Sequence, residues 1–115
     1  MGRIFFGTRA ASLAIVLCLS PMAAHAAEDF NLVIKDHRFE PARLVIPAGK
    51  KVKVVVVNQD PTPEEFESGQ LNREKIIGGK SQAVIFVGPL RPGEYKFFGD
   101  FHQDTAQGLI VAKEA

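Results

Sequence analysis

Apolar and polar residues largely alternate with a period of two in the segment 30–35, where Phe30, Leu32 and Ile34 share one face and Asn31 and Lys35 lie on the other. Such alternation predicts a β-strand with one buried face. The segment 51–58 is richer in valine and is apolar on both faces. β-Branched residues at this density favour a strand over a helix, and two apolar faces predict a position in the centre of a sheet.

Turn-forming residues separate these and further apolar segments. Pro47-Ala48-Gly49 ends one of them, and Pro61 and Pro63 keep the loop 58–63 out of any central strand. No part of the chain after residue 30 has a convincing helical period. The pattern predicts an all-β fold: a Greek-key antiparallel β-sandwich of seven to eight strands in a single domain. We expect the strands at residues 30–35, 44–46, 51–58, 65–68, 71–77, 83–87, 95–98 and 109–112.

The N-terminal segment has the three-part layout of a secretory signal peptide. Arg3 and Arg9 precede an apolar run at 10–19, and the small-residue triplet Ala24-His25-Ala26 follows. The apolar run is shorter than the roughly twenty residues that a membrane span needs. We therefore expect residues 1–26 to be a signal peptide that is cleaved on Sec-type export, and no membrane span afterwards. The domain would be residues 27–115.

Removal of that segment would leave a chain without sulfur, because Cys18, Met1 and Met22 all lie within it. Disulfides, thiolate nucleophiles, zinc–thiolate sites and iron–sulfur clusters would then be excluded. The charges are nearly balanced, with 14 basic and 13 acidic residues. This balance gives no electrostatic footprint for nucleic acid. The chain also has no motif typical of hydrolases or nucleotide-binding proteins, and we assign no catalytic or cofactor-binding residue.

The order of several short motifs resembles the cupredoxin family. Phe39-Glu40-Pro41 and Ile46-Pro47-Ala48-Gly49 resemble the opening of its domain, and 54–60 resembles its strand that ends in N-x-D. The segment 92–102, which begins Pro-Gly-Glu-Tyr and ends in a histidine, is similar to the closing part, as is the Gly-Leu-Ile-Val segment 108–111. The resemblance covers nearly the whole chain after the signal-like segment and implies the same sandwich fold.

In that family, copper lies at one end of the sandwich and is held by two histidines, a cysteine and often a methionine. His102 matches the second histidine, Gly99 falls where the cysteine stands, and Glu65 falls near the first histidine. No methionine is available for the axial position. Blue copper centres depend on a copper–thiolate bond, so we expect this protein to lack one.

A narrower resemblance comes from residues 65–75 and 97–106, which look like the periplasmic cupredoxin-like proteins that accompany bacterial high-affinity iron permeases. It implies a periplasmic location and binding of copper or iron. It also implies a role in oxidising or handing over ferrous iron, with an iron permease and other uptake subunits as partners.

His102 is the first candidate metal ligand because it lies in a polar loop directly after an apolar strand. Asp100 and Asp104 flank it and are candidate oxygen ligands, although an aspartate could equally fix the imidazole by a hydrogen bond. The alternative is a half-exposed loop histidine paired with a neighbouring aspartate. We expect His37, in the polar turn Asp36-His37-Arg38, to be a solvated surface residue.

Glu65 and Glu67 are the second pair of candidates. They lie two residues apart on a predicted strand, so their carboxylates point to the same side and repel unless a cation intervenes. The alternative is cross-strand pairing with Arg73 or Lys75. We expect Glu64 to point the other way, into solvent.

One imidazole with several carboxylates suits copper(II), iron or manganese better than copper(I), and a copper(II) site of this kind should be pale. The leading hypothesis is therefore a periplasmic metal-binding protein with a non-blue site that assists ferrous iron uptake, without being an enzyme itself. Two alternatives stay open: a copper-dependent ferroxidase, and a metal-free interaction module that docks through its loops.

Overall fold

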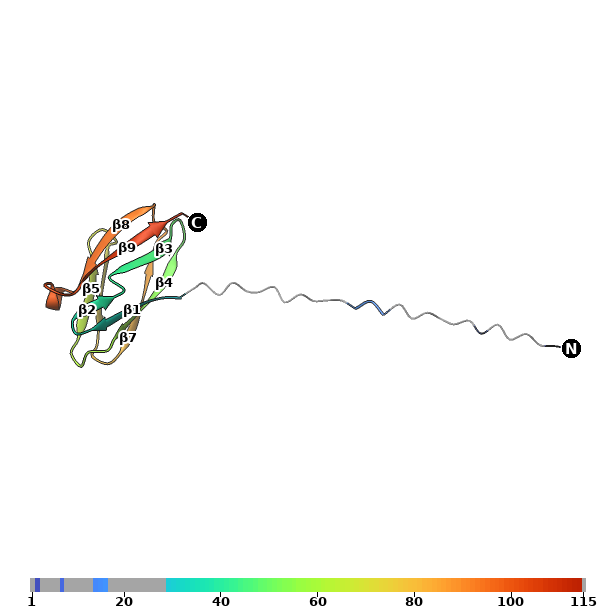
Figure 1. The fold of residues 1–115 in the computed structure, drawn as a ribbon, viewed down its shortest axis with the longest axis horizontal. Helices are drawn as coiled ribbons and strands as arrows, with labels where there is room; N and C mark the ends of the chain where they lie inside the picture. Colours follow the sequence, from blue (N-terminus) through green and yellow to red (C-terminus); the bar gives the residue numbers. More distant parts are fainter. Residues whose placement is uncertain (1, 3–6, 8–13, 17–28, 115) are drawn as a thin grey trace.

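The computed structural model describes residues 2, 7, 14–16 and 29–114, and in this part of the chain nine strands and one short 3-10 helix form a two-layered sandwich (Figure 1). The predicted signal-peptide cleavage site lies outside the described residues. Within those residues, no helix has the length and apolar character needed to cross a membrane.

One sheet has four strands and the other has five. The order in the first is β2 (Arg38–Glu40), β1 (Asp29–Lys35), β4 (Val52–Asn58) and β7 (Gln82–Val87). The order in the second is β3 (Arg43–Pro47), β9 (Gln107–Lys113), β8 (Gly93–Phe98), β5 (Glu64–Ser68) and β6 (Arg73–Ile77), and the 3-10 helix η1 (Asp100–His102) follows β8.

The predicted all-β sandwich is confirmed, with two differences in detail. The ninth strand is β2, which is three residues long and places only Phe39 in the interior. Two strand pairs are parallel, β1 with β4 and β3 with β9, whereas the other pairs are antiparallel. β4 lies inside its sheet, as its valines predict, but only one of its faces is fully buried, whereas the other, with Val55 and Val57, is half-buried.

The core between the sheets is centred on three aromatic rings, those of Phe39, Phe66 and Phe97. The Phe39 and Phe97 rings meet edge to face with centroids 4.9 Å apart, and the Phe66 and Phe97 rings stack at 4.8 Å. Each ring is almost completely buried, so each contributes about 1.5–3 kcal/mol by removal from water. These contacts hold β5 and β8 against β2 and thereby set the position of the loops at one end of the sandwich.

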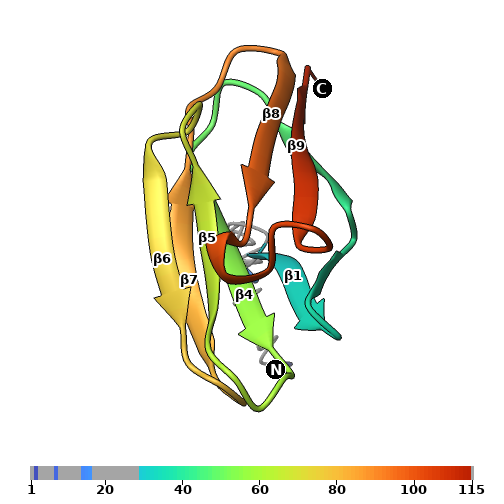
Figure 2. The ribbon, with the colours of Figure 1, turned by 90° about the vertical axis from the view of Figure 1, so that its left-hand side faces the viewer.

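At that end, three segments far apart in sequence come together: the β1–β2 turn, the start of β5 and the η1 loop. Figure 2 shows the η1 loop running from β8 past β5 before it enters β9. The N–H of Gly99 donates to the carbonyl of Ala106 at 2.8 Å and so closes this loop at its base. The Thr105 hydroxyl donates to the carbonyl of His37 at 2.6 Å, which ties the η1 loop to the β1–β2 turn.

Candidate metal centre

Successive residues of β5 point to opposite faces of their sheet, and this alternation separates its glutamates. Phe66 is a core residue, so Glu64, two positions earlier, also points into the sandwich, and only 1% of it is exposed. The expectation that Glu64 points into solvent is therefore wrong. A buried carboxylate must find polar partners to offset its lost hydration.

One partner of Glu64 is His102, which the short helix η1 carries over the end of the sandwich. Nδ1 of His102 lies 2.8 Å from Oε2 of Glu64. Because a carboxylate can only accept, this contact is a hydrogen bond in which the imidazole N–H donates. The His102 side chain is 34% exposed, so the imidazole is held by Glu64 and can still be reached from solvent.

The second partner is His37, at the β1–β2 turn. Its backbone has a positive φ of 56°, and its ring stacks on that of His102 with centroids 3.5 Å apart and planes 16° from parallel. Nδ1 of His37 lies 3.4 Å from the same Glu64 oxygen and is buried without a hydrogen-bond partner. The turn was predicted correctly, and the His37 side chain is 39% exposed, as expected of a surface residue, but its ring also stacks on that of His102 and so belongs to this group.

Asp60 holds the turn that carries His37. Its two carboxylate oxygens accept the backbone N–H groups of Asp36 and His37, both at 2.9 Å. The N–H of His37, followed by that of Asp36 and the charges of His37 and Lys80, keeps the pKa of Asp60 below its usual range despite its burial. Asp60 therefore acts as an anion that fastens the β1–β2 turn to the loop before β5.

The donor atoms of His37, Glu64 and His102 all lie within 4.8 Å of one another. Two ligands about 2.0–2.1 Å from a metal ion, at angles between square and tetrahedral, are about 2.8–3.4 Å apart. The contacts of 2.8 Å and 3.4 Å to the Glu64 oxygen fall in this range. Nδ1 of His37 makes no hydrogen bond, although carboxylate oxygens of Glu64 and Asp60 lie 3.4 Å and 3.5 Å away, and in its unprotonated form its lone pair would be available to a bound cation.

Gly99 occupies the position where the cysteine of a blue copper protein was expected, and it is closely packed. A Cβ atom there would lie 2.9 Å from the Ala106 Cβ, the Glu64 Oε1 and the Glu65 carbonyl oxygen. The space that a side chain at residue 99 would need is thus filled in part by the Glu64 carboxylate. The only cysteine of the chain, Cys18, lies outside the described residues.

A second group of carboxylates lies on the opposite face of β5, where Glu65, Glu67 and Asp100 approach within 4.8 Å of one another. Glu65 is only 3% exposed. Burial raises the pKa of its carboxyl to about 7, and the neighbouring carboxyl groups of Glu74, Glu67 and Asp100 act in the same direction.

The alternative of cross-strand ion pairs for these glutamates is wrong because of the strand register. Glu65 stands opposite Ile76 and Glu67 opposite Glu74. Arg73 instead faces Ser68, and its guanidinium donates to the backbone carbonyl of Phe86 at 2.9 Å.

The residues predicted as metal ligands are therefore divided between two places. His102 belongs to the group on the inner face of β5, and Glu65, Glu67 and Asp100 form the group on its outer face. Asp104 is exposed and belongs to neither group. Metal binding by these residues stays a prediction. The sequence carried one signal for the inner site: Glu64 lies two residues before the core residue Phe66 and so shares its inward face. No local sequence pattern indicated that His37 would join the site.

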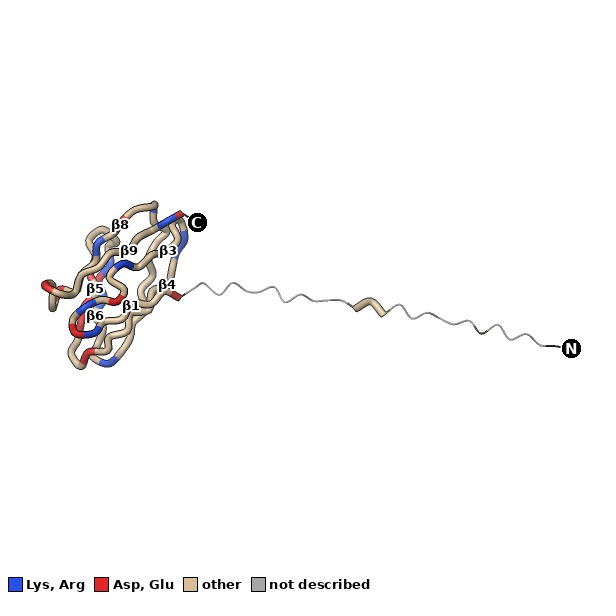
Figure 3. The backbone as a smooth tube through the Cα atoms, viewed as in Figure 1, with Lys and Arg blue, Asp and Glu red and all other residues tan. Residues whose placement is uncertain are grey.

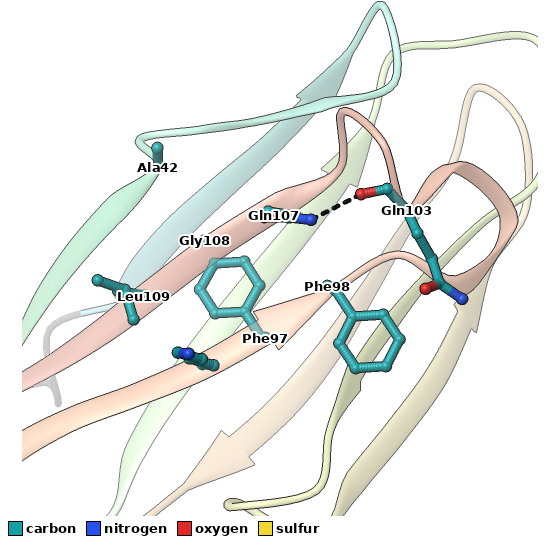
Figure 4. Close-up of a pocket in the computed structure, with 8 residues that line it drawn as sticks. Ala42, Phe97, Phe98, Gln103, Gln107, Gly108 and Leu109 are labelled. Carbon is teal, nitrogen blue, oxygen red and sulfur yellow. Dashed lines mark hydrogen bonds between the residues drawn. The ribbon is translucent and has the colours of Figure 1, made fainter.

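Two hollows border the η1 loop. One, of about 540 Å³, is lined by His37, Asp100, Phe101, His102, Gln103, Asp104 and Thr105 and gives solvent access to the histidine pair. The other, of about 590 Å³, lies on the β8–β9 side, where Figure 4 shows Phe97 and Phe98 beside the hydrogen bond from the Gln107 amide to the carbonyl of Gln103. Its lining has no histidine or carboxylate, so it offers no metal ligands. Figure 3 shows acidic and basic residues alternating with one another along much of the described backbone.

Comparison with known proteins finds one relative that is similar in sequence and several solved structures that are similar in fold. A Rickettsia prowazekii (strain Madrid E) protein described as uncharacterized protein RP394 is 45% identical over 86 residues, which are 75% of this chain and 69% of that protein. Among solved structures, amicyanin from Paracoccus versutus superposes with a TM-score of 0.60 at 16% identity, covering 76% of this chain and 83% of its own.

Auracyanin A, a blue copper protein of Chloroflexus aurantiacus, gives a TM-score of 0.63 at 12% identity over 75% of this chain and 98% of its own. These solved structures are similar in fold alone. The family of cupredoxin-like domains matches residues 8–112, nearly the whole chain. The chain therefore belongs to the cupredoxin-like family.

Proposed function

We propose that this chain is an exported, periplasmic metal-binding protein whose ion is held by His37, Glu64 and His102 rather than by a blue copper centre. The observation that carries the proposal is the buried Nδ1 of His37, which has no hydrogen-bond partner and lies 3.4 Å from a carboxylate oxygen that His102 also contacts. Two imidazoles and one carboxylate at one end of a sandwich form a donor set that suits copper(II) or iron.

The ion would supply a fixed positive charge and, for copper or iron, a one-electron redox couple. The chain's own residues would hold it in a defined place: Glu64 from the inner face of β5, His102 from η1, and His37 from the turn that Asp60 fastens. The exposed sides of the two imidazoles would leave room for solvent or for a partner's ligand.

The role in iron uptake rests on the sequence. The N-terminal pattern supports export, and residues 65–75 and 97–106 support kinship with proteins that accompany iron permeases. In this role the protein would assist the uptake of ferrous iron by binding or handing over a metal ion, with a permease and other uptake subunits as partners.

Titration with copper(II), followed by calorimetry and electron paramagnetic resonance, tests the site. We expect His37→Ala, His102→Ala and Glu64→Gln each to weaken copper(II) binding at least tenfold, and the copper spectrum of the wild type to show nitrogen ligands. Glu94→Gln is the matched control, since Glu94 is exposed on β8 and pairs with Arg43 at 3.0 Å. Equal copper affinity in wild type and both histidine variants would contradict the proposal and favour a metal-free docking module.

Iron(II) oxidation by dioxygen separates the accessory role from an enzyme. A metal-binding accessory protein should give no steady-state oxidation above that of copper(II) free in the same buffer. Sustained turnover by the copper-loaded protein, lost in His102→Ala, would instead identify a ferroxidase.

A further inference from the structure

Four carboxylates lie close together at the outer face of β5, and none of them has a basic partner among the described residues. Glu65 and Glu67 come from β5, Glu74 stands directly opposite Glu67 on β6, and Asp100 begins η1. Like charges in directly opposed positions of two strands destabilise a sheet. Among the described residues, no lysine or arginine forms an ion pair with any of the four.

Glu65 is the central member of this group, and its burial distinguishes the group from an ordinary acidic surface. Only 3% of Glu65 is exposed, and its Oε1 has no hydrogen-bond partner. A buried carboxylate oxygen that no donor reaches is a strong acceptor without a ligand. Its neighbours Glu67 and Asp100 place their oxygens within 4.8 Å of it and of each other.

The geometry fits a cation held by oxygens. Oxygen ligands of hard divalent ions lie about 2.0–2.6 Å from the metal, so ligands on opposite sides of such an ion are about 4–5 Å apart. One oxygen of Asp100 accepts the amide of Gln103 at 2.6 Å, which orients this carboxylate and leaves its other oxygen for an ion.

We propose that Glu65, Glu67 and Asp100, with Glu74 beside them, form a second metal site that takes a hard divalent cation such as manganese(II) or iron(II). The site is separate from the histidine site because the two use opposite faces of β5, through the consecutive residues Glu64 and Glu65. Its ligands are all oxygens, so it selects against copper(I) and prefers hard ions, whereas the histidine site offers nitrogen.

Manganese(II) binding tests the proposal, because free manganese(II) gives a six-line paramagnetic resonance spectrum that weakens on binding. We expect the wild type to bind one manganese(II) ion at this site, and Glu67→Gln and Asp100→Asn each to weaken binding at least tenfold. Glu94→Gln, which removes an exposed carboxylate from β8, should leave the affinity within twofold. Wild-type affinity in both Glu67→Gln and Asp100→Asn would overturn the proposal.

Glu65→Gln separates loss of a ligand from loss of the fold. The substitution keeps the shape of the side chain and removes a buried charge, so the metal-free variant should unfold at a higher urea concentration than the wild type. Weaker manganese(II) binding in a variant of raised stability would support a ligand role. Unchanged manganese(II) binding in this variant would overturn it.

Prior loading with one equivalent of copper(II) tests whether the two sites are separate. The manganese(II) affinity of the loaded protein should stay within threefold of that of the copper-free protein. Complete displacement of manganese(II) by that one equivalent would show a single shared site and overturn the proposal. The manganese measurements on copper-free protein stand whether or not the histidine site binds copper.

Discussion

Gly99→Ala adds one methyl group at the position where β5 and the η1 loop meet. The new Cβ would lie 2.9 Å from three atoms, of which one is the Cβ of the buried Ala106 and another is the backbone carbonyl oxygen of Glu65. Ordinary contacts of such an atom begin at 3.4 Å. The third atom, Oε1 of Glu64, can move only by disturbing the carboxylate that contacts His102.

Overpacking of this kind costs about 1–3 kcal/mol. The smaller backbone entropy of alanine in the unfolded chain returns about 0.4–1 kcal/mol, which leaves a net loss of up to about 2.6 kcal/mol, centred at about 1.3 kcal/mol, in the free energy of unfolding. For a domain of this size, each kcal/mol lowers the melting temperature by about 4–8 °C. Because Glu64 must shift, copper(II) affinity should also fall, by about tenfold.

Thermal unfolding followed by circular dichroism, together with copper(II) titration, measures both effects. Gly69→Ala is the matched control: it lies in the β5–β6 turn, and a Cβ there meets nothing within 4 Å. The control should melt at or above the wild-type temperature. If Gly99→Ala melted and bound copper(II) like Gly69→Ala, the close packing of Glu64 against residue 99 would be refuted.

One change of pH and two further substitutions give distinct expected outcomes. Metal-free protein should lose up to about 3 kcal/mol of stability as the pH rises from 4.5 to about 7. The reason is that over this range the unfolded chain releases the Glu65 proton, whereas the folded protein retains it. Urea unfolding at several pH values should show the decline, and the substitution Glu65→Gln should remove it. Asp60→Asn should cost about 1–3 kcal/mol, since two backbone N–H groups lose a charged acceptor, and copper(II) titration should show weaker binding as the turn that carries His37 loosens. A similar urea midpoint for wild type and Asp60→Asn would contradict this account. Phe97→Ala should cost about 3–5 kcal/mol, because it empties the centre of the aromatic cluster; retention of the wild-type melting temperature would contradict the assigned core.

The fold could be predicted because its main signals are local. The valines of β4 and the alternation in β1 specify strands by themselves, and the buried face of each is correct. β2 could not be predicted in this way, since three residues with one apolar side chain carry too short a pattern. Its strand character comes from pairing with β1, which is a tertiary effect.

The candidate site was only partly predictable, because it depends on which residues meet across the sandwich. The pairing of Glu65 and Glu67 on one face follows from their spacing. The contact between His37 and His102 joins residues 65 positions apart and requires the β1–β2 turn to fold over the η1 loop. The inward direction of Glu64 could have been inferred from its position two residues before Phe66, if that phenylalanine had been assigned to the core.

The consecutive placement of Glu64 and Glu65 makes the length of the preceding loop critical. Insertion or deletion of a single residue between Asn58 and Glu64 would slide β5 by one position against its neighbours and exchange its inward and outward side chains. Phe66 would leave the core, and the carboxylate beneath the two imidazoles would be replaced by a side chain from the other face. Apart from Asp60, whose carboxylate holds the β1–β2 turn, the segment 59–63 should therefore tolerate substitutions far better than changes in its number of residues.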